Sequence, residues 1–226
     1  MKVSIHQPEH LVWLGLLYKI DISDVFVVLD DVQFTKNNFQ NRNKVRIKDS
    51  FGWLTVPIKN HSLDTKIKDI EIAEDQKWRI KYLNTIRMNY AKAKYFDAYF
   101  PEIEKIINKN HKLLIDLNLD LLHFALNIFC ISDKKIFFSS EMNIDPVFKK
   151  SELLVQICNF VKSDCYISGS GGREYLDINS FTKSGINVEF IDFVISEYPQ
   201  IYDGFIPGMS FIDYLFNAGP TLPWKK

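Results

Sequence analysis

Residues 2–31, KVSIHQPEHLVWLGLLYKIDISDVFVVLDD, carry the pattern of a β-strand, an α-helix and a second β-strand. Lys2 to Ile5 is compatible with a short strand, and Pro8 keeps a helix from starting before it. Apolar residues then recur at helical spacing up to Ile20. Val25 to Leu29 is a continuous apolar run, which is typical of a parallel strand covered on both faces. The chain therefore opens as a βαβ unit.

The same pattern returns from about residue 134. KKIFFSSE (134–141) and NVEFIDF (187–193) have the composition of strands, SELLVQICNFV (151–161) that of a helix, and DCYISGSGG (164–172) that of a strand with a glycine turn. We therefore predict an α/β fold with a mostly parallel, doubly wound sheet, like those of nucleotide-binding proteins. Residues of about 1–48 and 134–195 build this sheet.

An insertion of about residues 49–130 separates the two βαβ parts. Antiparallel strands are predicted nearby at 44–48, 53–59 and 68–72. Three helices should follow: one over 78–90, one that begins at Pro101, and a long amphipathic one over 113–128. A last helix over 209–216 should end before Gly219. We find neither a repeat nor a linker, so we predict a single domain over residues 1–226.

Composition narrows the class of protein. Lys plus Arg and Asp plus Glu are 28 each, so the net charge is zero, which argues against a nucleic-acid-binding surface. Aromatic residues make up 14% of the chain, and we assign them mainly to the core. The three cysteines are too few for a disulfide framework and lack metal-ligand spacing, so no metal site is predicted. Neither a signal peptide nor a membrane span is found, which predicts a cytoplasmic protein.

Polar residues follow the first two strands. His6 and Gln7 come after the first, and Asp30 and Asp31 after the second. Ligands bind outside the carboxyl ends of strands in open α/β sheets, so we expect these four residues in a site. His6 could donate a hydrogen bond or act as a general acid or base, and an aspartate could bind Mg²⁺, accept from a ribose or act as a base. The alternatives are a histidine that satisfies a loop and solvated turn acids.

The run KNNFQNRNKVRIK (36–48) holds five positive charges and no acid, which is typical of a phosphate or carboxylate clamp. Lys36, Asn41, Arg42 and Asn43 lie in the predicted loop and are expected to contact the ligand, with the amide of Gln33 nearby. By contrast, the alternating cations at 44, 46 and 48 are expected on the solvated face of a strand.

SGSGGREYL (168–176) places three glycines after a strand. Such glycines let backbone N–H groups approach an oxyanion, with Ser168 and Arg173 available to assist. The segment matches neither a Walker A motif nor GxGxxG, and a tight structural turn is the alternative.

Five blocks together resemble the WbqC-like protein family: HQPEHLVWLG, SDVFVVLDDVQFTKNNFQNRNKV, GWLTVPI, CYISGSGGREYLD and FIPGMSFIDYLFNAGP. The resemblance runs from His6 to Pro220. It differs at His10 and Val12, where the family pattern HQPxYLPW has an aromatic residue and a proline, and at Ala218, where the family often has cysteine. The motif positions carried over are His6, Gln7, Pro8, Asp30, Asp31, Gln33, Lys36, Asn41, Arg42, Asn43, Ser168, Gly169, Tyr175 and Asp213.

The resemblance implies a bacterial enzyme of surface polysaccharide biosynthesis, because such genes accompany those for O-antigen lipopolysaccharide. We expect a transferase that moves an acyl or aminoacyl group to the amine of a nucleotide-linked amino sugar, with His6, Asp30 and Asp31 catalytic. The alternatives are an ATP-dependent adenylyl or nucleotidyl transferase and a non-catalytic binding protein of a polysaccharide assembly complex. The sequence identifies no cofactor, and an acyl-CoA or ATP with Mg²⁺ would serve these activities.

Overall fold

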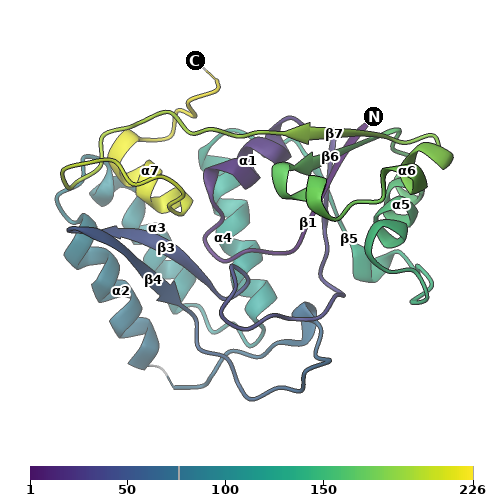
Figure 1. Cartoon of the computed structure of the whole chain (residues 1–226). Coiled ribbons are helices and arrows are strands. Elements are labelled where there is room, and N and C mark those ends of the chain that lie inside the picture. Colours follow the sequence, from purple (N-terminus) through teal and green to yellow (C-terminus); the bar gives the residue numbers. More distant parts are fainter. Residues whose placement is uncertain (76, 226) are drawn as a thin grey trace. The chain divides into compact units, whose positions relative to one another are not determined.

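A computed structural model describes residues 1–75 and 77–225 (Figure 1). The chain forms two compact units. The sheet unit comprises Met1–Gln7, Gly15–Asp31 and Ile131–Val194, and the helical unit comprises Pro8–Leu14, Val32–Cys130 and the chain from Ile195 onward. Each unit is therefore built from three separate stretches of sequence, and the two are described in turn. The prediction of a single domain stays a prediction.

The sheet unit holds five strands in the order β5-β2-β1-β6-β7, all paired in parallel. This confirms the predicted α/β class with a parallel sheet. The elements are β1 (Lys2–His6), α1 (Leu14–Asp21), β2 (Val25–Val28), β5 (Lys135–Phe138), η2 (Ser139–Glu141), α5 (Lys150–Phe160), β6 (Cys165–Gly169), η3 (Ser170–Glu174), α6 (Ile178–Lys183) and β7 (Asn187–Ile191).

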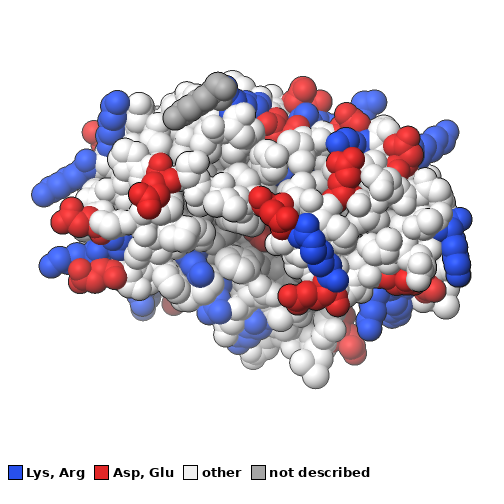
Figure 2. All heavy atoms as spheres, turned by 45° about the horizontal axis from the view of Figure 1, so that its top comes forward, with Lys and Arg blue, Asp and Glu red and all other residues white. Residues whose placement is uncertain are grey.

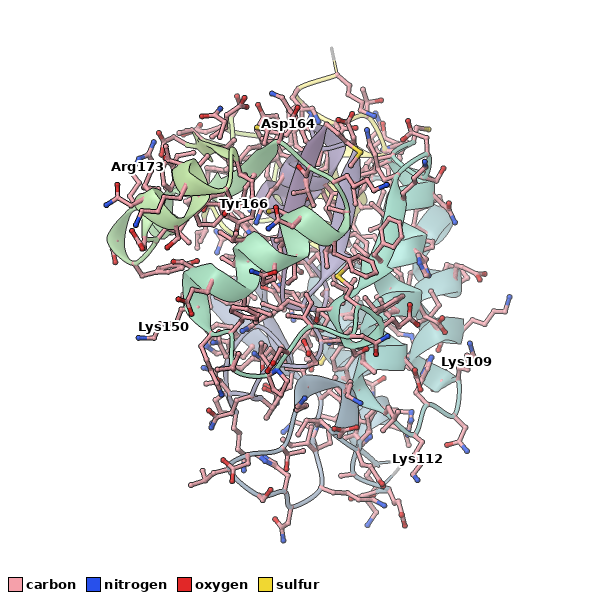
Figure 3. All side chains as sticks on the ribbon, turned by 90° about the vertical axis from the view of Figure 1, so that its right-hand side faces the viewer. Lys109, Lys112, Lys150, Asp164, Tyr166 and Arg173 are labelled. Carbon is pink, nitrogen blue, oxygen red and sulfur yellow. The ribbon has the colours of Figure 1, made fainter. Side chains whose placement is uncertain are left out.

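The core of the sheet unit lies between one face of the sheet and helices α5 and α6. Val3, Ile5 and Val27 pack there against Ile157 and Cys158 of α5, among other apolar side chains. Tyr166 of β6, labelled in Figure 3, stacks on the Phe181 ring of α6, with centroids 5.4 Å apart. Side chains alternate along a strand, so Ser4 and His6 face the opposite way, toward the side where a right-handed crossover places α1.

The helical unit carries the antiparallel hairpin of β3 (Arg42–Ile47) and β4 (Ser50–Thr55). These two strands correspond to the antiparallel strands predicted at 44–48 and 53–59. Its helices are η1 (Ile67–Asp69), α2 (Lys77–Tyr90), α3 (Phe96–Asn108), α4 (Leu114–Ile128) and α7 (Phe211–Ala218). The predicted strand over 68–72 is wrong, because Ile72 bridges Ile58 while Glu71 bridges Leu113, and single bridges to different partners form no ladder. Helix α3 starts before Pro101 because Phe96 and Phe100 stack, with centroids 4.6 Å apart, and extend its apolar face.

A buried hydrogen-bond network ties α7 to the rest of the helical unit. The Asp213 carboxylate accepts from Tyr90 Oη at 2.6 Å, and from Tyr198 Oη at 2.5 Å and Gln200 Nε2 at 2.8 Å. Burial raises the pKa of Asp213, while these three donors oppose the rise. The carboxylate therefore has a structural partner on each oxygen.

Arg46 does not lie on a solvated strand face as its alternation with other cations predicts. It is 2% exposed, and its guanidinium donates to the carbonyl oxygens of Ile47 at 2.6 Å, Ser50 at 3.0 Å and Asp203 at 2.7 Å. The fixed fork of five N–H donors suits such a set of carbonyls, so Arg46 holds the hairpin against the 195–210 segment.

The described residues 1–75 and 77–225 contain no helix that is both long and apolar enough to cross a membrane. Figure 2 shows acidic and basic side chains interspersed over the face drawn, in keeping with equal numbers of each in the chain.

We expect Arg46→Met to lower the free energy of unfolding by about 2–4 kcal/mol, because the carbonyl oxygens of Ile47, Ser50 and Asp203 lose a charged donor. Urea unfolding followed by circular dichroism measures the change. Lys48→Met, which removes an exposed charge from the same hairpin, is the control and should stay within about 0.5 kcal/mol. Equal effects of the two substitutions would contradict the structural role of Arg46.

Candidate functional site

The two central strands of the parallel sheet, β1 and β6, stop pairing before the carboxyl edge of the sheet. Pairing of β1 with β2 continues to His6, and pairing of β6 with β7 continues to Gly169. Pairing of β1 with β6, however, ends at Ser4 and Ile167. The last two residues of each central strand therefore diverge, at the point where connections leave in opposite directions. We call these strand ends the switch point; ligands usually bind at this position in open α/β sheets.

His6 ends β1 at the switch point and is half-buried. Its Nδ1 lies 2.9 Å from the carbonyl oxygen of Gln7. Because a carbonyl can only accept, the neutral ring carries its proton on Nδ1, and Nε2 is the acceptor. Burial, assisted by the charge of Lys19, lowers the pKa of His6 to about 4. The ring is therefore neutral at neutral pH.

Lys19 of α1 is a site residue that the sequence analysis missed. It is 5% exposed, and its ammonium donates to the carbonyl oxygen of Ile5 at 2.9 Å, beyond the point where β1 stops pairing with β6. The same Nζ lies 5.8 Å from the ring centroid of Tyr166. The helical spacing of the apolar residues places Lys19 on the buried face of α1. A buried ammonium group needs a hydrogen-bonding or ionic partner, so a lysine at such a position indicates that one is present.

Asp30 and Asp31 follow β2 and meet the end of the neighbouring strand β5. The Asp30 carboxylate is buried and accepts from Ser140 N at 3.0 Å and Ser140 Oγ at 2.7 Å. Ser139 Oγ lies between the two acids, 3.1 Å from Asp30 Oδ1 and also in contact with Asp31 Oδ1. Asp30 therefore fastens β2 to β5, while Asp31 is the more exposed of the two carboxylates.

The glycine segment after β6 forms the short turn η3 at the same edge of the sheet. Ser168 is 2% exposed and donates to the carbonyl oxygen of Gly169 at 3.2 Å. A Cβ on Gly172 would lie 2.1 Å from Ser168 Oγ, so only glycine lets η3 pack this closely on the end of β6. The structural-turn interpretation of this glycine therefore holds at position 172.

The side chains of Arg173 and Tyr175 are exposed, unlike that of Ser168 in the same segment. Arg173, labelled in Figure 3, makes a two-point ion pair with Asp192 at 2.7 and 2.9 Å, and both side chains are exposed. Its guanidinium also lies 4.9 Å from the ring centroid of Phe190. Tyr175 is 66% exposed. Arg173 thus binds the end of β7, and substrate contacts of Arg173 and Tyr175 stay predictions.

Eight residues of the predicted set belong to the sheet unit and lie at its carboxyl edge, in η3 or directly after η3. They are His6, Gln7, Asp30, Asp31, Ser168, Gly169, Arg173 and Tyr175. The remaining predicted site residues, Gln33, Lys36, Asn41, Arg42, Asn43 and Asp213, belong to the helical unit.

Three of these helical-unit residues bind backbone groups of their own unit. Gln33 Nε2 donates to the carbonyl oxygen of Leu63 at 2.8 Å. Asn41 donates to Val56 O at 3.1 Å and is buried, as is Asn43. Asn43 Nδ2 donates to the carbonyls of His10 and Leu11, each at 3.0 Å. These amides organise loops, and any contact with a ligand stays a prediction.

Lys36, Arg42 and Asp213 lie in three different settings. Lys36 is exposed in a turn, and Arg42 stacks on Trp53 with 4.1 Å between the guanidinium carbon and the ring centroid. Asp213 is 0% exposed and bound by three donors, so the structure gives its carboxylate an internal role.

His10, at a position where the family pattern has an aromatic residue, is fully buried. Its Nδ1 lies 2.9 Å from Asn118 Oδ1, and its Nε2 lies 2.6 Å from Tyr82 Oη. Burial lowers the pKa of His10 to about 4. Likewise, burial raises the pKa of the Cys158 thiol to about 12, as expected for an inert core cysteine.

These features define an α/β protein with an open parallel sheet and a candidate site at its switch point. The chain belongs to the WbqC-like protein family, whose family model matches residues 7–223. It is also 28% identical over 225 residues to a protein of Mycobacterium tuberculosis named "Uncharacterized protein Rv1507c", which covers 98% of this chain and 96% of that one. No solved structure matches the chain. The resemblance carried by the five sequence blocks is confirmed.

We expect Gly172→Ala to lower the free energy of unfolding by about 1–3 kcal/mol, because the new methyl group meets Ser168 Oγ and Leu176. Gly171→Ala is the matched control: its Cβ meets no atom within 4 Å, so it should be nearly neutral. Urea unfolding of both variants measures the difference. Equal stability of the two variants would show that Gly172 is not needed for close packing.

We expect the free energy of unfolding to fall as the pH drops from about 6.5 to about 4, and His6→Gln to weaken this dependence. The folded pKa of His6, about 4, lies below its unfolded value, so the unfolded state binds more protons in that window. Burial of His10 acts in the same direction, so part of the dependence remains. Urea unfolding at several pH values tests this, with His123→Gln on the exposed face of α4 as control. Parallel curves for wild type and His6→Gln would contradict it.

Proposed function

We propose that this protein is a transferase of surface polysaccharide biosynthesis that moves an acyl or aminoacyl group to the amine of a nucleotide-linked amino sugar. The observation that supports it is the divergence of β1 from β6 at the switch point, with His6 at the end of β1. A nucleotide is a usual ligand at such a switch point, because the strand ends and the following turns offer N–H donors around it.

His6 is proposed as the base that receives the proton of the attacking amine. Nδ1–H donates to Gln7 O, so the acceptor Nε2 carries out this step. A base with a pKa of about 4 is weak in the free protein. A phosphorylated substrate would bring negative charge to the ring and raise that pKa toward the neutral range, so binding would activate the base.

The two aspartates are proposed to have separate roles. Asp30 is engaged by Ser140 and Ser139, so it positions the ends of β2 and β5. Asp31 is more exposed and is the carboxylate proposed to orient the sugar or to bind Mg²⁺. In the described residues 1–75 and 77–225, no cluster of three or more His, Cys, Asp or Glu side chains is arranged to hold a metal ion.

A second candidate is ATP-dependent adenylyl or nucleotidyl transfer. It is favoured by the strand order: numbered by their sequence within the sheet, the strands stand as 3-2-1-4-5, which is the order of the first five strands of dinucleotide-binding sheets. Release of pyrophosphate in the presence of Mg²⁺ separates this reaction from acyl transfer. A non-catalytic binding role is less well supported, because His6, Asp30 and Asp31 gather at one edge of the sheet.

We expect His6→Ala to abolish turnover while the protein stays folded. Purified full-length protein is first screened by thermal unfolding with UDP-linked amino sugars, acyl-CoA and ATP with Mg²⁺; a ligand at 100 times its Kd stabilises by about 2.7 kcal/mol. Acylated product is then measured by mass spectrometry, and pyrophosphate release by a coupled assay.

The control is His61→Ala, since the Nδ1 of His61 makes the same kind of contact with the next carbonyl, Ser62 O at 2.9 Å, but outside the sheet unit. His61→Ala should retain turnover. Full activity of His6→Ala would exclude the proposed base, and pyrophosphate release without acylated product would favour the second candidate.

A further inference from the structure

One face of the β3–β4 hairpin carries the cations Arg42, Lys44 and Arg46 with two aromatic rings, and of these cations Arg46 is buried and bound to carbonyl oxygens. The antiparallel register sets Lys44 opposite Trp53 and Arg46 opposite Phe51. Because side chains alternate along each strand, Arg42 and Lys44 share a face with Phe51 and Trp53. We call these four residues the hairpin face. All four belong to the helical unit.

The rings hold the two cations in place. The Arg42 guanidinium lies 4.1 Å from the ring centroid of Trp53. Lys44 Nζ lies 4.5 Å from the Phe51 centroid and 5.6 Å from that of Trp53. The two rings themselves meet edge to face, with centroids 5.8 Å apart. Cation–π contacts of this kind restrict the side-chain rotamers, so less entropy is lost when a ligand binds.

The charges of Arg42 and Lys44 have no ionic partner in the described part of the chain. Among residues 1–75 and 77–225, no carboxylate lies within 4.0 Å of the charged nitrogens of Arg42 or Lys44, and Arg42 Nε is buried without a hydrogen-bond partner. Two other arginines do have ionic partners, Arg87 with Glu104 and Arg173 with Asp192. A pair of held, unneutralised cations indicates a site for an anion.

The spacing of the two cations fits a diphosphate. Residues two apart on one strand face are separated by roughly 6.6 Å, a span that two adjacent phosphoryl groups, one on each cation, can bridge. A diphosphate also carries more negative charge than a single phosphate or carboxylate, so it gains more from two cations. Trp53 is 38% exposed, so part of its ring is open to contact with a further group of the ligand.

We propose that the hairpin face binds the diphosphate group of a small ligand such as a nucleoside diphosphate derivative, with Arg42 and Lys44 on the phosphates and Trp53 beside them. This site lies wholly in the helical unit and does not depend on the transfer reaction proposed above. The proposal gives Lys44, Phe51 and Trp53 a role in ligand binding. The sequence alone predicts Lys44 on a solvated strand face and assigns the aromatic residues mainly to the core.

The test uses the full-length protein and inorganic pyrophosphate as the probe, titrated by calorimetry. Wild type should bind pyrophosphate about tenfold more tightly than orthophosphate. Arg42→Met and Lys44→Met keep the apolar stems but remove the charges, and each should weaken pyrophosphate binding about tenfold or more, because a charge-assisted contact is lost.

Lys48→Met is the matched control, since it removes an exposed charge from the turn between the two strands of the same hairpin. It should change pyrophosphate affinity by less than about twofold, since such a contact is screened by solvent. Binding should also change the tryptophan fluorescence, and Trp53→Phe should remove that change. Circular dichroism checks that each variant is folded.

Equal losses in Lys44→Met and Lys48→Met would overturn the proposal, as would equal affinity for pyrophosphate and orthophosphate or no binding at all. Because no turnover is measured, failure here leaves the His6 experiment unaffected. Conversely, a loss of turnover in His6→Ala would not alter pyrophosphate binding at the hairpin face.

Discussion

The divergence of β1 from β6 is the constraint on which the candidate site depends. Once pairing ends at Ser4 and Ile167, the backbone groups of the last two residues of each strand need other partners. Lys19 supplies one by binding Ile5 O, and the residues after β6 turn at once into η3. The same positive charge, added to burial, keeps His6 neutral. The end of the pairing and the position of the buried lysine therefore have one cause, and the lysine adds to the burial that lowers the pKa of His6.

Polar burial has a different purpose in the helical unit. Arg46 binds carbonyls from the hairpin and from the 195–210 segment, and Asp213 binds two tyrosines and a glutamine. His10 bridges Asn118 and Tyr82 in the same way. Each group has defined partners in one geometry, so together they fix loops that apolar packing alone would leave free to shift.

The sequence could predict the sheet because Val25–Val28 is a short apolar run typical of a covered parallel strand, and Cys165–Ile167 is a similar run followed by a glycine turn. It also placed His6 and Asp30 at the proper edge, since strand ends follow from topology. Arg46 could not be placed, because its acceptor Asp203 O lies 157 residues away and local alternation says nothing of it. Lys19 was missed for a similar reason: its partner carbonyl is available only because two strands separate.

The interleaving of the two units has a consequence for biosynthesis. Lys2 of the central strand pairs with Cys165, and β2 pairs with β5, so neither early strand can complete its ladder until the chain beyond it has been made. At translation rates of roughly 5–20 residues per second, β1 waits on the order of ten to thirty seconds for β6. During that interval two apolar strand edges are open in the nascent chain. Completion of the sheet therefore has to wait until the chain has been made through β7.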